Sequence, residues 1–296
     1  MERRQVLLVD AFADEPTGGR QIPVLPSGGD LSESQRVTVA EEFRSPGVAT
    51  VQDGQVVYTE DGQRHATIEG GIAGLASLFE RGYFDTGTQE ITAGNRSRSV
   101  EIDSDGTVWI ETEPQAVTDS AATEGTIADA LGIDVAALRD VGADLPIASV
   151  SGRGGSLLVP VNFFEHLSGA DPDGAALADL LASEGATRLF VFTFDTLAAE
   201  SDAHARVFDT VGRASSCVER ATSGAAAVAL GAHLSGQSVL DADRTAIRIE
   251  CGHVLDRPAT MQVTLEDAPS VGGRAVTSLD GEMVLPDEDP DDIIEV

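Results

Sequence analysis

The chain has 296 residues, 42% of them hydrophobic, and carries a formal net charge of −31. Its 50 acidic residues outnumber 19 basic residues, all of which are arginine. Such a charge repels the phosphates of nucleic acids and the headgroups of anionic membranes, so neither is expected as a partner. The length favours two domains over one small hydrophobic core.

The acidic residues are scattered along the chain rather than gathered in one block. This pattern suits a protein that works in very high salt, where counterions screen the self-repulsion. We therefore attribute the charge to a halophilic source and do not invoke function for it.

The two cysteines, Cys217 and Cys251, have neither CxxC nor Cys/His spacing, so no disulfide framework and no zinc site is expected. The N-terminus enters a strand-like run at residues 5–12 without the ~7–15 apolar residues of a signal peptide. No run approaches the ~20 apolar residues of a membrane span. These features predict a cytoplasmic protein.

In the first half, alternating and apolar patterns predict a sheet with two helices. Ser32 and Gln35 form a capping box at the start of the first helix, and Asp53-Gly54 is a typical hairpin turn. The expected elements are strands at 5–12, 47–51, 55–59, 90–92, 98–103 and 107–112, a helix after Ser32, and a glycine-led helix with its apolar face at 72–79.

Residues 113–126, rich in Thr, Ala, Asp and Pro, are the best linker candidate. We therefore predict domains at 1–118 and 119–286, followed by a mobile acidic tail at 287–296. The elements expected in the second half are short helices at 127–131 and 135–138, strands within 145–152, 155–161 and 189–194, a helix at 175–184, and two strands within 246–266.

Each half contains a small-residue helix that begins at a polar or glycine-rich turn. Thr222, Ser223 and Gly224 precede the apolar helix 225–233, where backbone N–H groups and the helix dipole favour an anion such as a carboxylate. An ordinary Ser/Thr cap on a core helix is the alternative. Glu69, Gly70 and Gly71 stand in the same relation to the first helix.

The order of these pieces resembles the PhzF family of phenazine-biosynthesis-type isomerases, whose fold is shared with diaminopimelate epimerase. The stretches that carry the resemblance are VDAFADEP at 9–16, LSESQRVTVAEEF at 31–43, ALGID at 130–134, GSLLVPV at 155–161, RVF at 206–208, ERATSGAAA at 219–227 and CGHVLDRPATMQV at 251–263.

The resemblance implies an α+β fold of two similar domains, each a mixed β-sheet or open barrel wrapped around a central helix. It places the substrate between the N-termini of the two helices. It further implies a homodimer and a proton shift on a small carboxylated metabolite, performed by a carboxylate without metal or cofactor.

The chain departs from the family pattern at several motifs. Ser45-Pro46-Gly47 stands where the family has Ser-Glu-Thr, Gly70-Gly71 where it has Gly-His, and Gly19-Arg20-Gln21 where it has Gly-Asn-Pro. The family's Asp-Pro-Ala-Thr-Gly-Ser is here residues 219–224, ERATSG.

Glu219 keeps a carboxylate at the family's aspartate position, so we expect it to transfer protons or to contact substrate; an acid favoured by the helix dipole is the alternative. Glu69 lies close to where the epimerase relatives carry a cysteine base, which raises the hypothesis that Glu69 and Glu219 pair across the cleft. Gly70, Gly71, Thr222, Ser223 and Gly224 are the expected substrate-binding residues. Cys217, near this turn, is interpreted as a structural cysteine.

Two functions follow. The first is a divergent cofactor-independent isomerase or epimerase. The second is a catalytically inactive relative that keeps the fold for ligand binding or assembly, because the family's glutamate and histidine are missing.

Overall fold

The computed structural model describes residues 2–52, 55–60, 63–65, 67–93, 96–139, 141, 145–150, 154–210, 217–241 and 243–285. The predicted Asp53-Gly54 turn and the acidic tail at 287–296 lie outside the described residues. The two strands that this turn was expected to join are antiparallel partners, which agrees with a hairpin.

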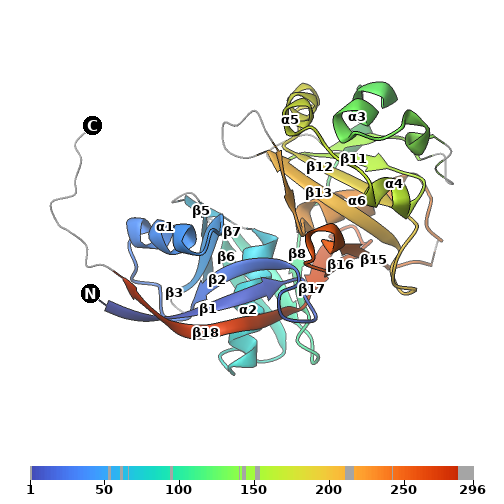
Figure 1. The fold of residues 1–296 in the computed structure, drawn as a ribbon. Helices are drawn as coiled ribbons and strands as arrows, with labels where there is room; N and C mark the ends of the chain where they lie inside the picture. Colours follow the sequence, from blue (N-terminus) through green and yellow to red (C-terminus); the bar gives the residue numbers. More distant parts are fainter. Residues whose placement is uncertain are drawn as a thin grey trace.

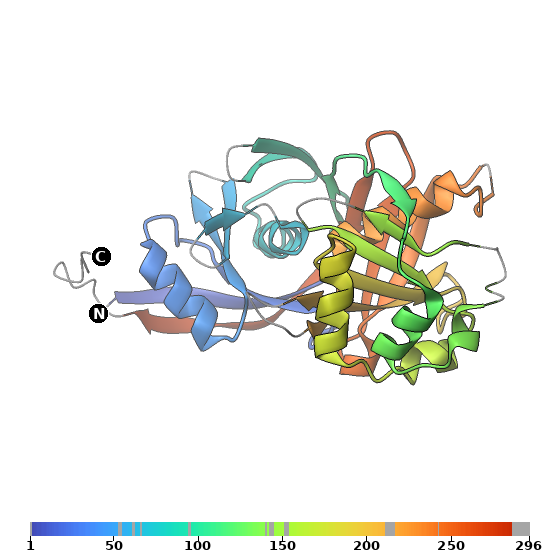
Figure 2. The ribbon, with the colours of Figure 1, turned by 90° about the horizontal axis from the view of Figure 1, so that it is seen from above.

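The first lobe is formed by the N-terminal part of the chain together with the last strand. Its elements are β1 (Glu2–Ala11), β2 (Arg20–Leu25), α1 (Glu33–Glu42), β3 (Gly47–Gln52), β4 (Gln55–Glu60), β5 (Gln63–His65), α2 (Ile68–Glu80), β6 (Gly87–Ala93), β7 (Arg96–Ile102), β8 (Val108–Glu111) and β18 (Ala275–Leu285). One sheet has the strand order β18-β1-β2-β3-β4-β5. Helix α2 packs against this sheet on one side and against β8 on the other, and Figure 2 shows it end-on in cyan, surrounded by strands.

The second lobe repeats this plan around α6. Its elements are β9 (Val117–Asp119), α3 (Glu124–Leu131), the 3-10 helix η1 (Val135–Leu138), β10 (Ala148–Val150), β11 (Ser156–Pro160), α4 (Phe164–Ser168), α5 (Gly174–Ser183), β12 (Arg188–Thr193), β13 (Ala203–Thr210), β14 (Cys217–Arg220), α6 (Gly224–Gly236), β15 (Ala246–Cys251), the 3-10 helix η2 (His253–Leu255), β16 (Ala259–Thr264) and β17 (Ser270–Gly273). The large sheet has the order β6-β7-β8-β17-β16-β15-β13-β12-β11-β10-β9, with β14 beside β13.

The strands β11 and β12 read as continuous apolar runs because both faces of the sheet are covered. Phe190 and Phe192 belong to the core that contains α6, whereas the alternate residues Leu189 and Val191 belong to the core under α3 and α5. Side chains alternate between the two faces of a strand, so a sheet with helices on both sides needs apolar residues at every position. Figure 1 shows α3 and α5 on the side of the sheet away from α6.

The two central helices, α2 and α6, are buried because they are apolar on nearly every side. In α2 the residues from Ile68 to Leu78 are all buried, and in α6 the described side chains are apolar or small around the whole circumference except at His233 and the last turn. A helix without a polar face is stable only inside a core. The predicted α+β architecture, with a sheet wrapped around a central helix in each half, is confirmed.

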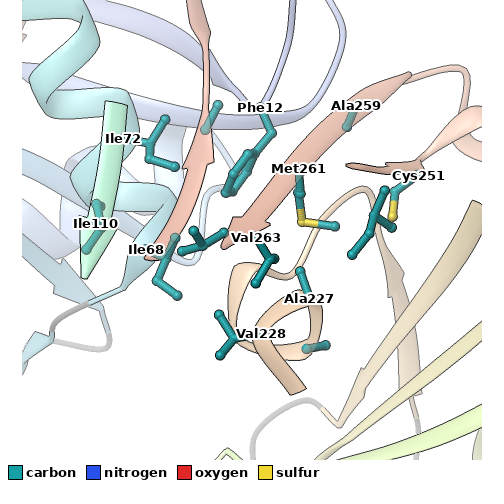
Figure 3. Packing of buried hydrophobic residues seen from close by; sticks show 14 of the residues in the cluster. Phe12, Ile68, Ile72, Ile110, Ala227, Val228, Cys251, Ala259, Met261 and Val263 are labelled. Atoms are coloured by element: carbon teal, nitrogen blue, oxygen red, sulfur yellow. The ribbon is translucent and has the colours of Figure 1, made fainter. Parts of the chain in front are cut away.

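The lobes are joined by strand pairing and by one core. Strand β17 pairs with β8, and β18 then returns along β1 at the far edge of the first lobe (Figure 1). The buried cluster runs from Ile68 and Ile72 of α2 to Val228 of α6 and Val263 of β16 (Figure 3). Strand β18 lies within the range predicted for the second domain but pairs in the first lobe, because its partner β1 is almost the whole chain length away in sequence.

An ion pair also joins the lobes. Asp10 in β1 is fully buried, and its Oδ1 lies 2.7 Å from Nη2 of Arg257, just before β16. The Arg257 guanidinium also donates to the carbonyl oxygens of Gly18 and Gly19. A buried carboxylate needs such a partner. This contact connects two stretches, VDAFADEP and CGHVLDRPATMQV, that carry the family resemblance.

The predicted linker at 113–126 is wrong in part, because it contains β9 and the beginning of α3. Strand β9 has three residues and its pairing with β10 depends on a distant segment, so its pattern is too short to recognise locally. In the described part of the chain no helix is long and apolar enough to cross a membrane.

Candidate functional site

The first turns of α2 and α6 meet between the lobes. Thr67 caps α2 by accepting the amide hydrogen of Gly70 at 3.1 Å, and Ser223 caps α6 by accepting that of Ala226 at 3.3 Å. The carboxylate of Glu69, in the first turn of α2, accepts the amide hydrogen of Gly224 at 2.9 Å. A side chain of one helix therefore satisfies a free N–H group at the start of the other.

Glycine at position 224 allows this close approach. A Cβ atom placed there would lie 2.6 Å from Cγ2 of Ile68, on the first turn of the opposite helix. Real Cβ atoms essentially never come so close to another carbon. The two helix starts are thus in direct backbone-to-side-chain contact.

A cavity of about 510 Å³ opens beside these helix starts. Both lobes line it. The first contributes Thr67, Ile68 and Glu69, and the second contributes Ser223 and Val228, with the segment 112–116 between them. Three arginines also line it, namely Arg20, Arg98 and Arg188. This volume accommodates a small metabolite.

Of the residues predicted to bind substrate, Ser223 lines this cavity, whereas Gly70, Gly71, Thr222 and Gly224 do not. The Gly71 amide donates to the Thr67 carbonyl oxygen as part of α2. The Thr222 side chain is fully buried, and its hydroxyl has no hydrogen-bond partner among the described residues. The amide hydrogens of Gly70 and Gly224 already bind protein acceptors. They are therefore not free to hold an anion, as the sequence had led us to expect.

Of the two predicted proton-transfer residues, Glu69 lines the cavity and is 7% exposed. Glu219 does not line it. Glu219 lies on β14, where its carboxylate makes a two-pronged ion pair with Arg206, at 2.9 Å to Nε and 2.8 Å to Nη2. The two carboxylates thus have separate partners, Gly224 for Glu69 and Arg206 for Glu219.

Arg206 is buried and forms hydrogen bonds to several segments of the second lobe. It is 5% exposed, and its Nη1 donates to the carbonyl oxygens of Leu167 and Ala170 at 3.0 and 2.8 Å. The guanidinium also lies over the ring of Phe208. With Glu219, these contacts use the planar fork of the arginine on all sides.

The ring of Tyr58 packs closely against two glycines near the helix start of α2. Its buried ring lies against Gly47 and Gly70 together: a Cβ atom at either position would come within 2.7 Å of ring atoms. Gly47 belongs to the segment that replaces Ser-Glu-Thr, and the ring leaves no room for a larger side chain there. Gly70 corresponds to the glycine of the family's Gly-His, so the ring does not bear on the missing histidine.

A second polar cluster surrounds His204 of β13. Its Nδ1 lies 3.0 Å from Oε1 of Glu250, whose carboxylate also accepts the amide hydrogens of Leu197 and Ala198. The rings of Phe164 and His253 contact the imidazole. Burial lowers the pKa of His204, although Glu250 acts in the opposite direction.

Both cysteines are without a disulfide. Burial raises the pKa of the Cys217 thiol, with nearby Asp209 as a second cause, and complete burial raises that of Cys251 strongly. Raised values disfavour the thiolate that a base or nucleophile requires. In the described part of the chain, no three His, Cys, Asp or Glu side chains gather closely enough to hold a metal ion.

The arginines of the cavity were not predicted as site residues. Arg98 alternates along β7 with Val100 and Ile102, which are both buried. Since alternate residues of a strand share a face, this spacing places Arg98 on the inward face. An arginine in phase with two core residues is the signal that could have identified it.

These features define a two-lobed α+β protein of the epimerase-like class, with a cavity where two central helices begin. A phenazine biosynthesis protein of the PhzF family from Bacillus anthracis has the same fold, with a TM-score of 0.81, 18% identity, and coverage of 96% of this chain and 100% of that one. A protein described as a predicted epimerase from Pseudomonas aeruginosa matches with a TM-score of 0.72 and 21% identity over 95% of this chain and 99% of its own.

Sequence comparison identifies the family. The model of the phenazine biosynthesis-like proteins, PhzC-PhzF, matches residues 64–281. The chain therefore belongs to the PhzC-PhzF family. An uncharacterized isomerase of Bacillus subtilis, YfhB, is 26% identical over 298 aligned residues, which cover 96% of this chain and 97% of the relative.

Proposed function

We propose that the protein is a cofactor-independent isomerase or epimerase, which moves a proton on a small carboxylated metabolite bound in the cavity between the lobes. The observation that carries this proposal is the position of Glu69. Its carboxylate lines the cavity, is almost fully buried, and is oriented by the amide of Gly224. Membership of the family and similarity to an isomerase support the same class of reaction.

Glu69 has the geometry of a general base. One carboxylate oxygen, Oε1, accepts the Gly224 hydrogen, and Oε2 accepts no hydrogen bond from the described residues. The free oxygen takes a proton from a carbon next to a carbonyl or carboxyl group and returns it elsewhere on the substrate. Donors aimed at the substrate would stabilise the negative charge that develops on it.

Glu219 has a different role in this proposal. Because its two oxygens bind Arg206, it holds that guanidinium against the carbonyls of Leu167 and Ala170. We assign Glu219 as a positioning residue rather than as the proton-transfer group.

Deuterium exchange tests the proposal. The protein is incubated in buffered high-salt D₂O with a panel of small carboxylic acids that have an acidic carbon, and incorporation is followed by NMR. We expect exchange into at least one compound and a loss of 10²-fold or more in Glu69→Gln. Glu101→Gln, an exposed carboxylate on β7, is the matched control. Exchange at the wild-type rate in Glu69→Gln contradicts the proposal.

The alternative is a catalytically inactive ligand-binding relative. It is favoured by Tyr58, whose ring leaves no room for a larger side chain at Gly47, in the segment that replaces the family's Ser-Glu-Thr. Absence of exchange over the whole panel, together with ligand binding in the cavity, supports this alternative.

A further inference from the structure

The backbone donors at the helix starts are largely in use. The Gly224 amide donates to Glu69, the Ala226 amide to the Ser223 hydroxyl, and the Gly70 amide to Thr67. An anionic ligand would have to displace a protein acceptor from each of these groups. It would also stand next to the Glu69 carboxylate, which repels it. Another cation in the cavity is therefore needed to hold a negatively charged ligand.

The arginines that line the cavity differ in how they are paired. Arg188 lies against Asp209, with Nε at 2.7 Å from Oδ1, and its Nη1 donates to the Gly154 carbonyl. Its charge is compensated. Arg98 instead donates one long hydrogen bond, 3.4 Å, to the backbone carbonyl of Glu111, and it has no carboxylate partner among the described residues.

This lack of a partner is unusual for this chain. With 50 acidic and 19 basic residues, a carboxylate is easily available to any arginine. Arg98 is half-buried and lies on the same face of β7 as the buried Val100 and Ile102. A guanidinium that lines a cavity and uses one of its five N–H donors is available to bind a ligand anion.

We infer that Arg98 binds the carboxylate of the ligand, and so presents the neighbouring acidic carbon to Glu69. This inference rests on the proposed function, and it names Arg98 as the residue that selects carboxylate substrates. A carboxylate matches the planar fork of the guanidinium with two parallel hydrogen bonds. Its single negative charge balances one arginine, whereas a phosphate dianion would leave excess negative charge beside Glu69 and Glu113, which line the same cavity.

Binding measurements test the inference directly. The probes are propionate, succinate and benzoate, with succinamide and benzamide as uncharged analogues and inorganic phosphate as the competing anion, all at constant ionic strength. Thermal unfolding shifts identify the tightest carboxylate, and titration calorimetry gives its Kd. We expect at least one carboxylate to bind, its amide not to bind, and phosphate to bind more weakly.

Variants then locate the binding group. Arg98→Gln weakens carboxylate binding by about 10- to 100-fold, since it removes a charge-assisted pair. Arg98→Lys keeps the positive charge but loses the two parallel N–H donors of the guanidinium, so we expect it to bind carboxylate with intermediate strength. It replaces Arg98→Gln as the test variant if that variant does not fold. Arg3→Gln removes the same charge from an exposed arginine on β1 and binds as the wild type does.

Several results overturn the inference: no carboxylate binds the wild-type protein, phosphate binds more tightly than every carboxylate, or Arg98→Gln or Arg98→Lys binds with wild-type affinity. The proposed function is tested separately through Glu69→Gln, which keeps an oxygen acceptor for Gly224 and is expected to bind carboxylate without exchanging deuterium. Binding that depends on Arg98 without any exchange in the wild type rejects the isomerase alone. Exchange that depends on Glu69 but not on Arg98 rejects the inference alone.

Discussion

The carboxylate of Glu69 accepts the amide hydrogen of Gly224 at 2.9 Å, so a side chain of α2 caps the start of α6. The two residues are separated by 155 positions in sequence. The first lobe thus completes the helix start of the second, which makes the geometry of the cavity depend on how the lobes are joined. Under the proposed function, Glu69 therefore serves both proton transfer and stability.

Replacing Glu69 separates these two roles. Glu69→Ala leaves the buried Gly224 amide without an acceptor, and we expect a loss of about 1–3 kcal/mol in the free energy of unfolding. Glu69→Gln keeps an acceptor oxygen and loses less. Urea unfolding in high salt measures both. Equal stability of the alanine variant and the wild type would show that the hydrogen bond contributes nothing.

The contact between Gly224 and Ile68 gives a second prediction. Gly224→Ala places a methyl group 2.6 Å from Cγ2 of Ile68, and overpacking of this kind costs about 1–3 kcal/mol. Gly236→Ala is the matched control, because a Cβ at the other end of α6 meets no atom within 4 Å. Alanine there is expected to stabilise the helix by up to about 1 kcal/mol.

A double variant checks the cause of the Gly224→Ala effect. Ile68→Ala alone loses buried apolar surface, but combined with Gly224→Ala it opens space for the new methyl group. The two losses are thus expected to be less than additive in thermal or urea unfolding. If the two losses in unfolding free energy are strictly additive, the Gly224→Ala effect does not come from a clash with Ile68.

Local patterns in the sequence predicted much of this fold. The capping box of Ser32 and Gln35 begins α1 as expected, because both hydrogen bonds depend on residues three positions apart. The apolar helices α2 and α6 and the continuous strand β12 follow from composition and spacing. These features need no knowledge of distant segments.

The cavity was harder to predict, because its key contacts join distant parts of the chain. Glu69 was identified as a candidate beside a helix start, yet its partner Gly224 belongs to the other lobe. Glu219 was expected to transfer protons or to contact substrate, but β14 pairs it opposite Phe208, where its carboxylate reaches Arg206 two residues along β13. Arg98 alternates with Val100 and Ile102, so the sequence indicates its face of β7. Its place in the cavity could not be predicted, because both lobes line that cavity.

The ion pair of Arg206 and Glu219 gives an asymmetric prediction. Arg206→Ala leaves the part-buried Glu219 carboxylate and two carbonyl oxygens, those of Leu167 and Ala170, without their donor. We expect a loss of about 3–5 kcal/mol in the free energy of unfolding. Glu219→Gln retains an acceptor for Arg206 and is expected to cost less. A larger loss for Glu219→Gln than for Arg206→Ala would contradict this assignment.

Two buried histidines predict how stability changes with pH. Burial lowers the pKa of His204 and of His233, whose Nε2 lies 2.9 Å from the Pro146 carbonyl oxygen. In the unfolded chain both take up a proton below a pKa of about 6.5, whereas in the folded protein they stay neutral to lower pH. Protons then favour the unfolded state. The free energy of unfolding is therefore expected to fall as the pH decreases below about 6.5, by up to about 1.4 kcal/mol per pH unit for each histidine.

Urea unfolding between pH 7.5 and 5.5 measures this slope, in a range above the titration of ordinary carboxylates. His233→Gln retains an N–H donor for the Pro146 carbonyl but cannot take up a proton, so its stability should decrease less steeply with falling pH than that of the wild type. NMR titration of the imidazole C–H signals gives the folded-state pKa values independently. A variant with the wild-type slope, or a wild-type stability that does not change in this range, would contradict the assignment of His233 as a neutral buried histidine.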